Sequence, residues 1–171
     1  MSIFERELQQ CLPDLWRYAH ALTRNRDLAD DLVQDCAERA LRKRRLWRPT
    51  GPLKPWLMKM LLNLYRNQRR SEARRPRLVA IDADDPAHEA RAADPLAARL
   101  DLADLSHAVA ALPGEQREAL LLVVLGGLSY KEAAEVLDIA QGTLMSRIAR
   151  ARAALRAAGG ENPIMKRQGR S

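Results

Sequence analysis

Apolar residues recur every three or four positions along most of the sequence, which is the spacing of a buried helical face. We expect a first amphipathic helix over residues 4–22, with Pro13 as a point where it could kink or restart. A second pattern covers residues 29–41 and follows Asn25, a residue type that caps helix starts. No segment alternates in the manner of a strand, so the pattern predicts an all-α fold.

A loop with three helix-breaking residues, Pro49, Gly51 and Pro52, is expected at residues 46–54. Pro55 then suits the first position of a third helix. We expect the buried face of that helix to hold Trp56, Leu57, Met60, Leu61 and Leu64. The opposite face is polar and basic, and its members share one side of the helix: Lys59, Asn63, Arg66, Asn67, Arg70 and Arg74.

The charge of the chain falls into three parts. Residues 1–75 hold 17 basic and 9 acidic side chains, residues 76–113 hold 3 and 7, and residues 114–171 hold 9 and 6. Residues 76–94 are also Ala-rich and without periodicity, so we expect an acidic, flexible linker there. The chain is therefore expected to form two small helical domains and a tail, which are residues 1–75, residues 95–158 and the disordered basic stretch 159–171.

Pro95 and Pro113 are each expected to open a helix. The apolar positions of the first helix are Leu102, Leu105, Val109 and Leu112. Those of the second are Leu120, Val123 and Val124. Ser129 and Glu132 then form a capping-box sequence that opens a short helix. A turn at residues 138–140 leads into a last helix, with Leu144, Ile148, Ala151 and Leu155 inward. This order is typical of a helix-turn-helix, whose second helix lies in the DNA major groove.

The start of that last helix carries side chains suited to reading bases. Arg can pair bidentately with guanine and Gln with adenine, while Thr offers a hydroxyl or a methyl contact. The candidate readers are Gln141, Thr143, Ser146, Arg147 and Arg150. Gly142 would let the helix start approach a phosphate closely. Periodicity alone also fits an ordinary helical hairpin with a solvated basic face, and both interpretations stand at this point.

Composition narrows the function classes. A net charge of +7 favours a polyanionic partner such as nucleic acid, although ribosomal and membrane-surface proteins share this balance. No catalytic triad, phosphate loop, cofactor fingerprint or metal-ligand spacing appears, so we expect no enzyme, no cofactor and no metal. Cys11 and Cys36 lie on apolar faces and are interpreted as small hydrophobic residues rather than a redox pair. No membrane-length apolar run or secretory signal is present, so we expect a cytoplasmic protein without a membrane partner.

The C-terminal half resembles region four of the extracytoplasmic-function sigma factors, which are subunits of bacterial RNA polymerase. The resemblance lies in Leu112-Pro113 with Gln116-Arg117, in the run 128–134, and in the run 142–147 followed by Arg150-Ala151-Arg152. It implies that the candidate readers contact the promoter's minus-35 element. Met145 departs from the usual polar or basic residue, and Ala140 supplies no side-chain cap, so the resemblance does not imply a particular promoter sequence.

The N-terminal half resembles region two of the same family. Residues 30–35 are similar to the segment that family members place against the clamp helices of the largest polymerase subunit, which implies contacts by Asp31, Gln34 and Asp35. Trp56-Leu57 and Asn63, with the basic residues downstream, are similar to the helix that engages the minus-ten element. Asn67 stands where Asp is common, and Leu62 where a small residue often sits.

A basic helix face beside an irregular loop suits unpaired DNA, because phosphates follow the positive surface and an extruded base can stack or enter a pocket. Trp47 and Arg48 lie in the loop and could flank such a base, although packing of Trp47 against the helix ends is the alternative. The expected minus-ten contacts are Trp47, Arg48, Lys59, Asn63, Arg66, Asn67 and Arg70. The alternative for the helical members is a solvated face.

The resemblance thus implies a sigma factor that directs core RNA polymerase to promoters and helps to open the minus-ten region. Expected partners are core RNA polymerase, promoter DNA and an anti-sigma factor, and we expect a monomer when the chain is free. One alternative is a sigma-like decoy for an anti-sigma factor, against which the intact basic faces and the lack of a receiver-domain pattern argue. The other is a stand-alone helix-turn-helix regulator, which should dimerise and protect DNA without polymerase.

Overall fold

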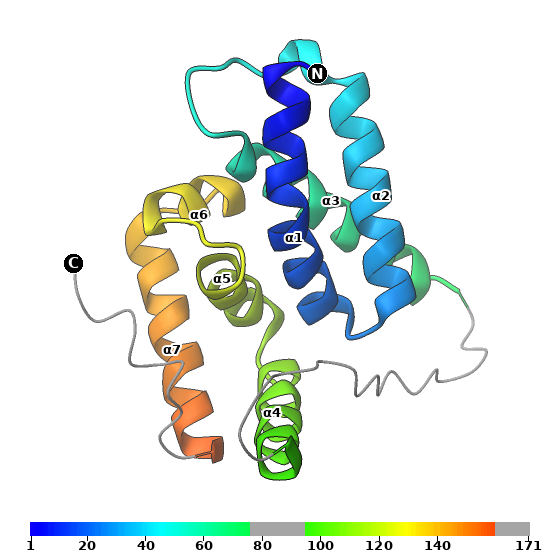
Figure 1. The fold of residues 1–171 in the computed structure, drawn as a ribbon. Helices are drawn as coiled ribbons and strands as arrows, with labels where there is room; N and C mark the ends of the chain where they lie inside the picture. The colour runs from blue at the N-terminus through cyan, green and yellow to red at the C-terminus, as the bar shows by residue number, and fades with distance from the viewer. Residues whose placement is uncertain (76–94, 160–171) are drawn as a thin grey trace.

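The structure, a computed structural model, describes residues 1–75 and 95–159, with side chains described from residue 102 onward in the second stretch. Seven α-helices and one 3-10 turn make up these residues, and no strand occurs among them (Figure 1). The predicted all-α class is therefore confirmed. The predicted linker at residues 76–94 and nearly all of the predicted tail lie outside the described residues.

Three helices form the N-terminal half: α1 (Ile3–Thr23), α2 (Arg26–Arg42) and α3 (Leu53–Ala73), with the 3-10 turn η1 (Arg44–Leu46) after α2. Each packs against the other two. Leu15, Leu57 and Leu61 are fully buried in the core between them. Because burying one such side chain contributes roughly 1.5–3 kcal/mol, this apolar contact is the main force holding the three helices together.

Polar side chains determine where α1 and α2 begin. Glu5 donates its N–H to Ser2 Oγ over 3.2 Å, and Ser2 donates its N–H to the Glu5 carboxylate over 2.9 Å, which completes a capping box. Leu28 donates its N–H to Asn25 Oδ1 over 3.0 Å, so the predicted cap of α2 is confirmed. Pro13 lies inside α1, and the helix continues past it without restarting.

The start and the buried face of α3 differ from the prediction. The helix begins at Leu53, two residues before Pro55, and Leu53 itself is buried. Trp56 and Met60 are half-buried rather than buried, whereas Met58, Leu62 and Tyr65 are added to the core. The Tyr65 hydroxyl donates to the Leu22 carbonyl of α1 over 3.3 Å, and α3 contacts α6 as well as α1 and α2. A helix covered from more than one side buries more than a single apolar stripe.

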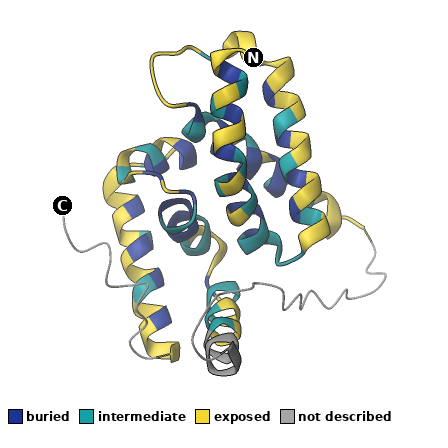
Figure 2. Cartoon of the chain, viewed as in Figure 1, coloured by how far each residue is buried: buried dark blue, intermediate teal, exposed yellow. Residues whose placement is uncertain are grey.

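The C-terminal half consists of α4 (Pro95–Ala110), α5 (Gly114–Val124), α6 (Tyr130–Leu137) and α7 (Gln141–Gly159). Helices α5, α6 and α7 pack on one another around Leu122, Leu144 and Ile148. The predicted burial of α4 is wrong at Leu102, Leu105 and Val109, which are half-buried, while Leu112 after the helix is buried. These residues are only partly covered because α4 lies at the edge of the molecule and packs against α7 (Figure 2).

The predicted capping box at the start of α6 is confirmed. Glu132 donates its N–H to Ser129 Oγ over 3.1 Å, and Ser129 donates its N–H to the Glu132 carboxylate over 3.0 Å. Since α6 has only eight residues, two satisfied N–H groups are a large part of its hydrogen bonding. The cap thereby stabilises the helix that supports α7.

Replacing Ser129 with Ala should lower the free energy of unfolding by about 1 kcal/mol, because an N-terminal N–H of α6 loses its acceptor. Urea denaturation followed by circular dichroism measures this change. Ser106→Ala is the control, since Ser106 is exposed within α4 and caps no helix. Equal stability of the two variants would show that the hydroxyl of Ser129 contributes nothing.

The two halves are in contact. Helix α5 lies beside α1, and α6 lies beside α3 (Figure 1). Helix α7 follows α6 on the side away from α1 and α2, so its outer face is open to solvent (Figures 1 and 2). This arrangement places the polar face of α3 near the C-terminal half and leaves α7 accessible.

Candidate nucleic-acid interface

Helix α7 has an anchoring face and an exposed face. Leu144, Ile148 and Ala151 are buried and hold the helix to the rest of the C-terminal half. The predicted base-reading residues lie outside this core, with Gln141, Gly142, Thr143, Ser146 and Arg150 exposed and Arg147 half-buried. Positions 143, 146, 147 and 150 share one side of a helix. The structure therefore brings these side chains together near the start of α7.

The turn before α7 is set by Asp138. This residue adopts the left-handed conformation with φ of 56° and donates its N–H to the carbonyls of Ala134 and Glu135. Asp enters this region more readily than most residues. The first hydrogen bond of α7 follows at once, from the Leu144 N–H to the Ala140 carbonyl over 3.1 Å. A short capped helix, a tight turn and a longer helix are thus present as predicted.

A hollow beside the exposed face connects α7 with the start of α5. It is lined by Pro113, Glu115 and Gln116 together with Thr143, Ser146, Arg147 and Arg150. Glu115 and Gln116 are not among the residues predicted from the sequence as site members. Only the packing of α5 on α7 brings them near the readers, and no spacing along the chain signals it.

One acidic side chain in this hollow faces a predicted reader. The Glu115 carboxylate lies 3.6 Å from Arg147 Nη2. Because the Glu115 side chain is 75% exposed, solvent screens this pair and it adds little to stability. The arginine is consequently held near α5 by a contact that DNA could replace.

Some side chains on the polar face of α3 are exposed, and others form ion pairs with the C-terminal half. Asn63, Asn67 and Arg70 are exposed. Lys59 Nζ lies 3.7 Å from the carboxylate of Asp138, in the turn between α6 and α7. Both members of that pair are well exposed, so the contact is weak.

Arg66 makes a close polar contact between the two halves. Its Nη2 and Nε donate to the two carboxylate oxygens of Glu118, over 2.6 and 3.3 Å. These hydrogen bonds raise the pKa of Arg66, so the guanidinium stays charged. The hydroxyl of Tyr18, a fully buried residue, donates to the Glu118 carbonyl oxygen over 3.4 Å. Arg66 and Tyr18 thus meet one residue of α5 from α3 and α1.

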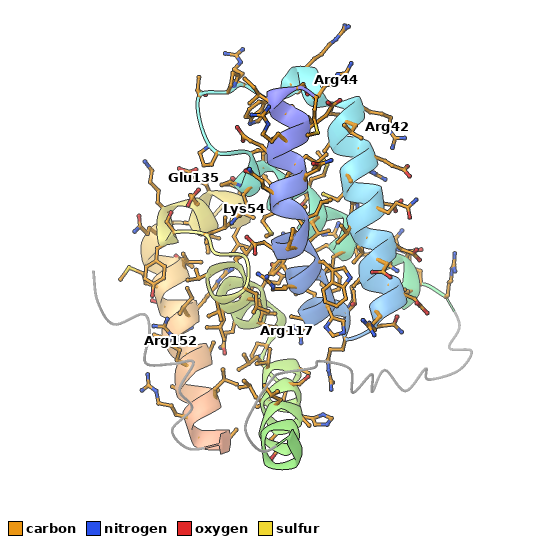
Figure 3. The ribbon with its side chains drawn as sticks, viewed as in Figure 1. Arg42, Arg44, Lys54, Arg117, Glu135 and Arg152 are labelled. Carbon is orange, nitrogen blue, oxygen red and sulfur yellow. The ribbon has the colours of Figure 1, made fainter. Side chains whose placement is uncertain are left out.

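The loop before α3 places its two predicted DNA contacts differently. Arg48 is exposed, whereas Trp47 is half-buried and meets Phe4 edge-on, with ring centroids 5.6 Å apart. Packing of Trp47 on the start of α1 is therefore observed, and its contact with DNA stays a prediction. Arg42 at the end of α2 and Arg44 in η1 are exposed and extend outward (Figure 3).

The acidic side chains of α2 have unequal surroundings. Asp31, Gln34 and Asp35 are exposed and lie on one side of the helix. Asp30 instead accepts a hydrogen bond from Trp16 Nε1 over 2.7 Å, which ties α2 to α1. The structure thus separates an acid that stabilises the fold from three side chains that a partner could contact.

Both cysteines lie in the apolar core. Cys11 and Cys36 are buried free thiols. Burial raises the pKa of Cys11 and raises that of Cys36 to about 12, so both thiols stay protonated. Among residues 1–75 and 102–159 no group of three or more His, Cys, Asp or Glu side chains could hold a metal ion. None of the described helices combines the length and the apolar character needed to cross a membrane.

Two protein families match separate segments of the chain. Residues 102–155 match the family described as Sigma-70, region 4. Residues 8–62 match the family described as the Sigma2 domain of PhyR. Each segment lies within one of the two helical halves of the structure.

Relatives are similar over most of the chain. The ECF RNA polymerase sigma factor EcfG of Rhodopseudomonas palustris is 38% identical over 152 residues, which cover 88% of this chain and 82% of that protein. The ECF RNA polymerase sigma factor SigC of Mycobacterium tuberculosis is 34% identical over 149 residues, 83% of this chain and 75% of that protein. The sigma factor RpoE of Bartonella quintana, solved in complex with the anti-sigma factor NepR, is similar in structure. Its TM-score is 0.73 at 32% identity, with 91% of this chain and 95% of that chain covered.

Proposed function

This chain belongs to the extracytoplasmic-function family of RNA polymerase sigma factors, and we propose that three of its surfaces divide the work of promoter recognition. A sigma factor directs RNA polymerase to promoters in transcription initiation, and the family is regulatory rather than enzymatic. The observation that carries the proposal is the exposed face of α7, with Thr143, Ser146 and Arg150 held outward by a buried anchor.

We assign region two to residues 1–75 and region four to residues 95–158. The linker 76–94 would connect them, and residues 159–171 would form a basic tail. The matched segments, 8–62 and 102–155, fall inside the two proposed regions and support these boundaries.

The exposed face of α7 would read the minus-35 element from the major groove. Arg147 and Arg150 offer bidentate hydrogen bonds to guanine, and Gln141 offers them to adenine. Thr143 and Ser146 offer hydroxyl contacts, and Gly142 allows close approach to a phosphate. Exchange of the Glu115 contact for a base would release Arg147 with little loss, because the Glu115 side chain is 75% exposed to solvent.

The polar face of α3 and the loop before it would hold the unpaired minus-ten strand. Lys59, Arg66 and Arg70 would meet phosphates, while Asn63 and Asn67 offer amide groups to bases. Arg48 would flank the strand from the loop, and Trp47 would stack on a base only if its ring turned from Phe4. Because single-strand binding of this kind depends on charge, it should weaken as salt rises.

The exposed acidic face of α2, formed by Asp31, Gln34 and Asp35, would dock on core RNA polymerase. The polymerase would then catalyse RNA synthesis, and this chain would supply the promoter address and strand capture. We further propose that an anti-sigma factor controls the chain. The structural similarity to RpoE bound to NepR supports that partner. We also propose that the free chain is a monomer in the cytoplasm.

Run-off transcription with purified core polymerase on fragmented genomic DNA tests the proposal. Addition of the chain should produce discrete new transcripts whose start sites share an upstream and a minus-ten element. The same reaction without the chain is the control. Transcripts that are identical with and without the chain would refute promoter selection.

A further inference from the structure

The contact between the two halves uses side chains that the proposed function assigns to DNA. We propose that the free chain closes through a clasp, defined as Arg66, Glu118 and Tyr18, in which the Glu118 carboxylate occupies the place of a DNA phosphate. Closure withholds Arg66, one of the proposed phosphate contacts of the minus-ten face, until polymerase separates the halves. The inference rests on the proposed role of Arg66 in binding DNA.

The geometry of the clasp makes closure and phosphate binding by Arg66 mutually exclusive. Arg66 donates to both Glu118 oxygens, over 2.6 and 3.3 Å. A guanidinium fork matches carboxylate and phosphate in the same two-point manner. Since these two donors are occupied, Arg66 cannot present them to a phosphate until Glu118 withdraws.

Tyr18 is a second contact of α5 with the N-terminal half. Tyr18 is fully buried, and its hydroxyl donates to the backbone carbonyl of Glu118 in α5. A buried hydroxyl without a partner is costly. Opening would expose this hydroxyl to water, which can replace the carbonyl, so the clasp can be released without leaving a buried group unsatisfied.

The burial of the ion pair suits a reversible contact. The Glu118 side chain is 13% exposed and that of Arg66 is 36% exposed, so the pair is only partly screened by solvent. Its attraction is offset by the cost of removing both charges from water. The nearby pair of Lys59 and Asp138, 3.7 Å apart, is well exposed and adds little. Binding to polymerase can therefore outweigh the clasp.

The larger the fraction of free chains that is closed, the more weakly the free chain should bind DNA. If about nine-tenths of free chains are closed, the apparent Kd for single-stranded DNA is raised about tenfold. Glu118→Gln removes the charge and one acceptor oxygen, and it should recover about threefold to tenfold of that affinity. Glu135→Gln is the matched control. Glu135 is an exposed acid of the same half on α6, outside the clasp, and its loss changes the net charge equally (Figure 3).

Distance measurement tests closure directly. Dyes attached to Gln9→Cys on α1 and Ala154→Cys on α7 report the separation of the halves by energy transfer, since both positions are exposed. The native thiols are buried, with raised pKa values, and should label slowly. Glu118→Gln should lengthen the distance relative to wild type, and Glu135→Gln should leave it unchanged. Glu118→Arg should open the chain further, and adding Arg66→Glu to it should close the chain again.

A second arm measures binding of a fluorescent mixed-sequence single-stranded oligonucleotide by anisotropy, with thermal melts confirming that each variant is folded. Longer distance together with tighter binding in Glu118→Gln supports the clasp. Unchanged distances in Glu118→Gln and Glu118→Arg overturn it. Association with core polymerase, followed by gel filtration, is scored separately. If the chain does not associate with core polymerase, the proposed function is wrong. If it associates but the dye-to-dye distance is the same in wild type and the Glu118 variants, only the clasp is wrong.

Discussion

Replacing Arg147 with Ala should lower discrimination at one base pair of the upstream element by roughly 1–3 kcal/mol, about 5- to 150-fold. The reason is that a bidentate pair with a base edge distinguishes that base from the other three. Arg147 lies on the exposed side of an anchored helix, beside Thr143, Ser146 and Arg150. Run-off transcription from a promoter library randomised at the upstream element measures the loss position by position.

The matched control for this variant is Arg156→Ala, which removes an exposed arginine from the last turn of the same helix. It should leave the base preferences unchanged. If Arg147→Ala weakens all upstream sequences by the same factor, the guanidinium contacts a phosphate, and its assignment as a base reader is wrong.

The double replacement Asp31→Ala with Gln34→Ala should weaken association with core polymerase by at least about tenfold, or 1.4 kcal/mol. Both side chains are exposed on one side of α2, and Asp31 has no structural role of the kind that Asp30 has toward Trp16. The fold should therefore be unaffected. Competition against labelled wild-type chain for core polymerase measures the affinity.

Glu7 and Gln10 provide a matched control on α1, because they are an acid and an amide with the same three-residue separation. Their double replacement with Ala should leave polymerase binding unchanged. Equal affinities of the two double variants would show that the acidic face of α2 is not the docking surface.

Local signals in the sequence predict much of the fold. The Ser129 and Glu132 capping box and the Asn25 cap are confirmed, because a cap depends on residues within one turn of the chain. Helix spacing likewise predicts the buried anchor of α7, including Leu144 and Ile148.

Features that depend on tertiary packing were beyond these signals. Met58 is buried outside the predicted apolar stripe of α3, which contacts α6 as well as the helices of its own half, and Trp56 within the stripe is only half-buried. The apolar residues of α4 are only partly covered, because periodicity shows that a helix has an apolar side but not how completely a neighbour covers it.

In the candidate site too, local features could be predicted from the sequence, whereas contacts between helices could not. The position of the candidate base-reading residues near the start of α7 follows from the helix-turn-helix pattern, and the structure brings these side chains together. Glu115 beside Arg147 and Glu118 on Arg66 could not be foreseen. The two residues of the second pair are 52 positions apart, and the pattern of single helices carries no information on which charges meet across two domains.

The most direct test of the account is a footprint on a promoter identified by run-off transcription, made with holoenzyme, with core polymerase alone and with the chain alone. The account predicts that holoenzyme protects both the upstream and the minus-ten elements and makes the minus-ten bases reactive to single-strand probes. The chain alone should protect neither. Protection of a two-fold symmetric site by the chain without polymerase would contradict the account and identify a stand-alone regulator.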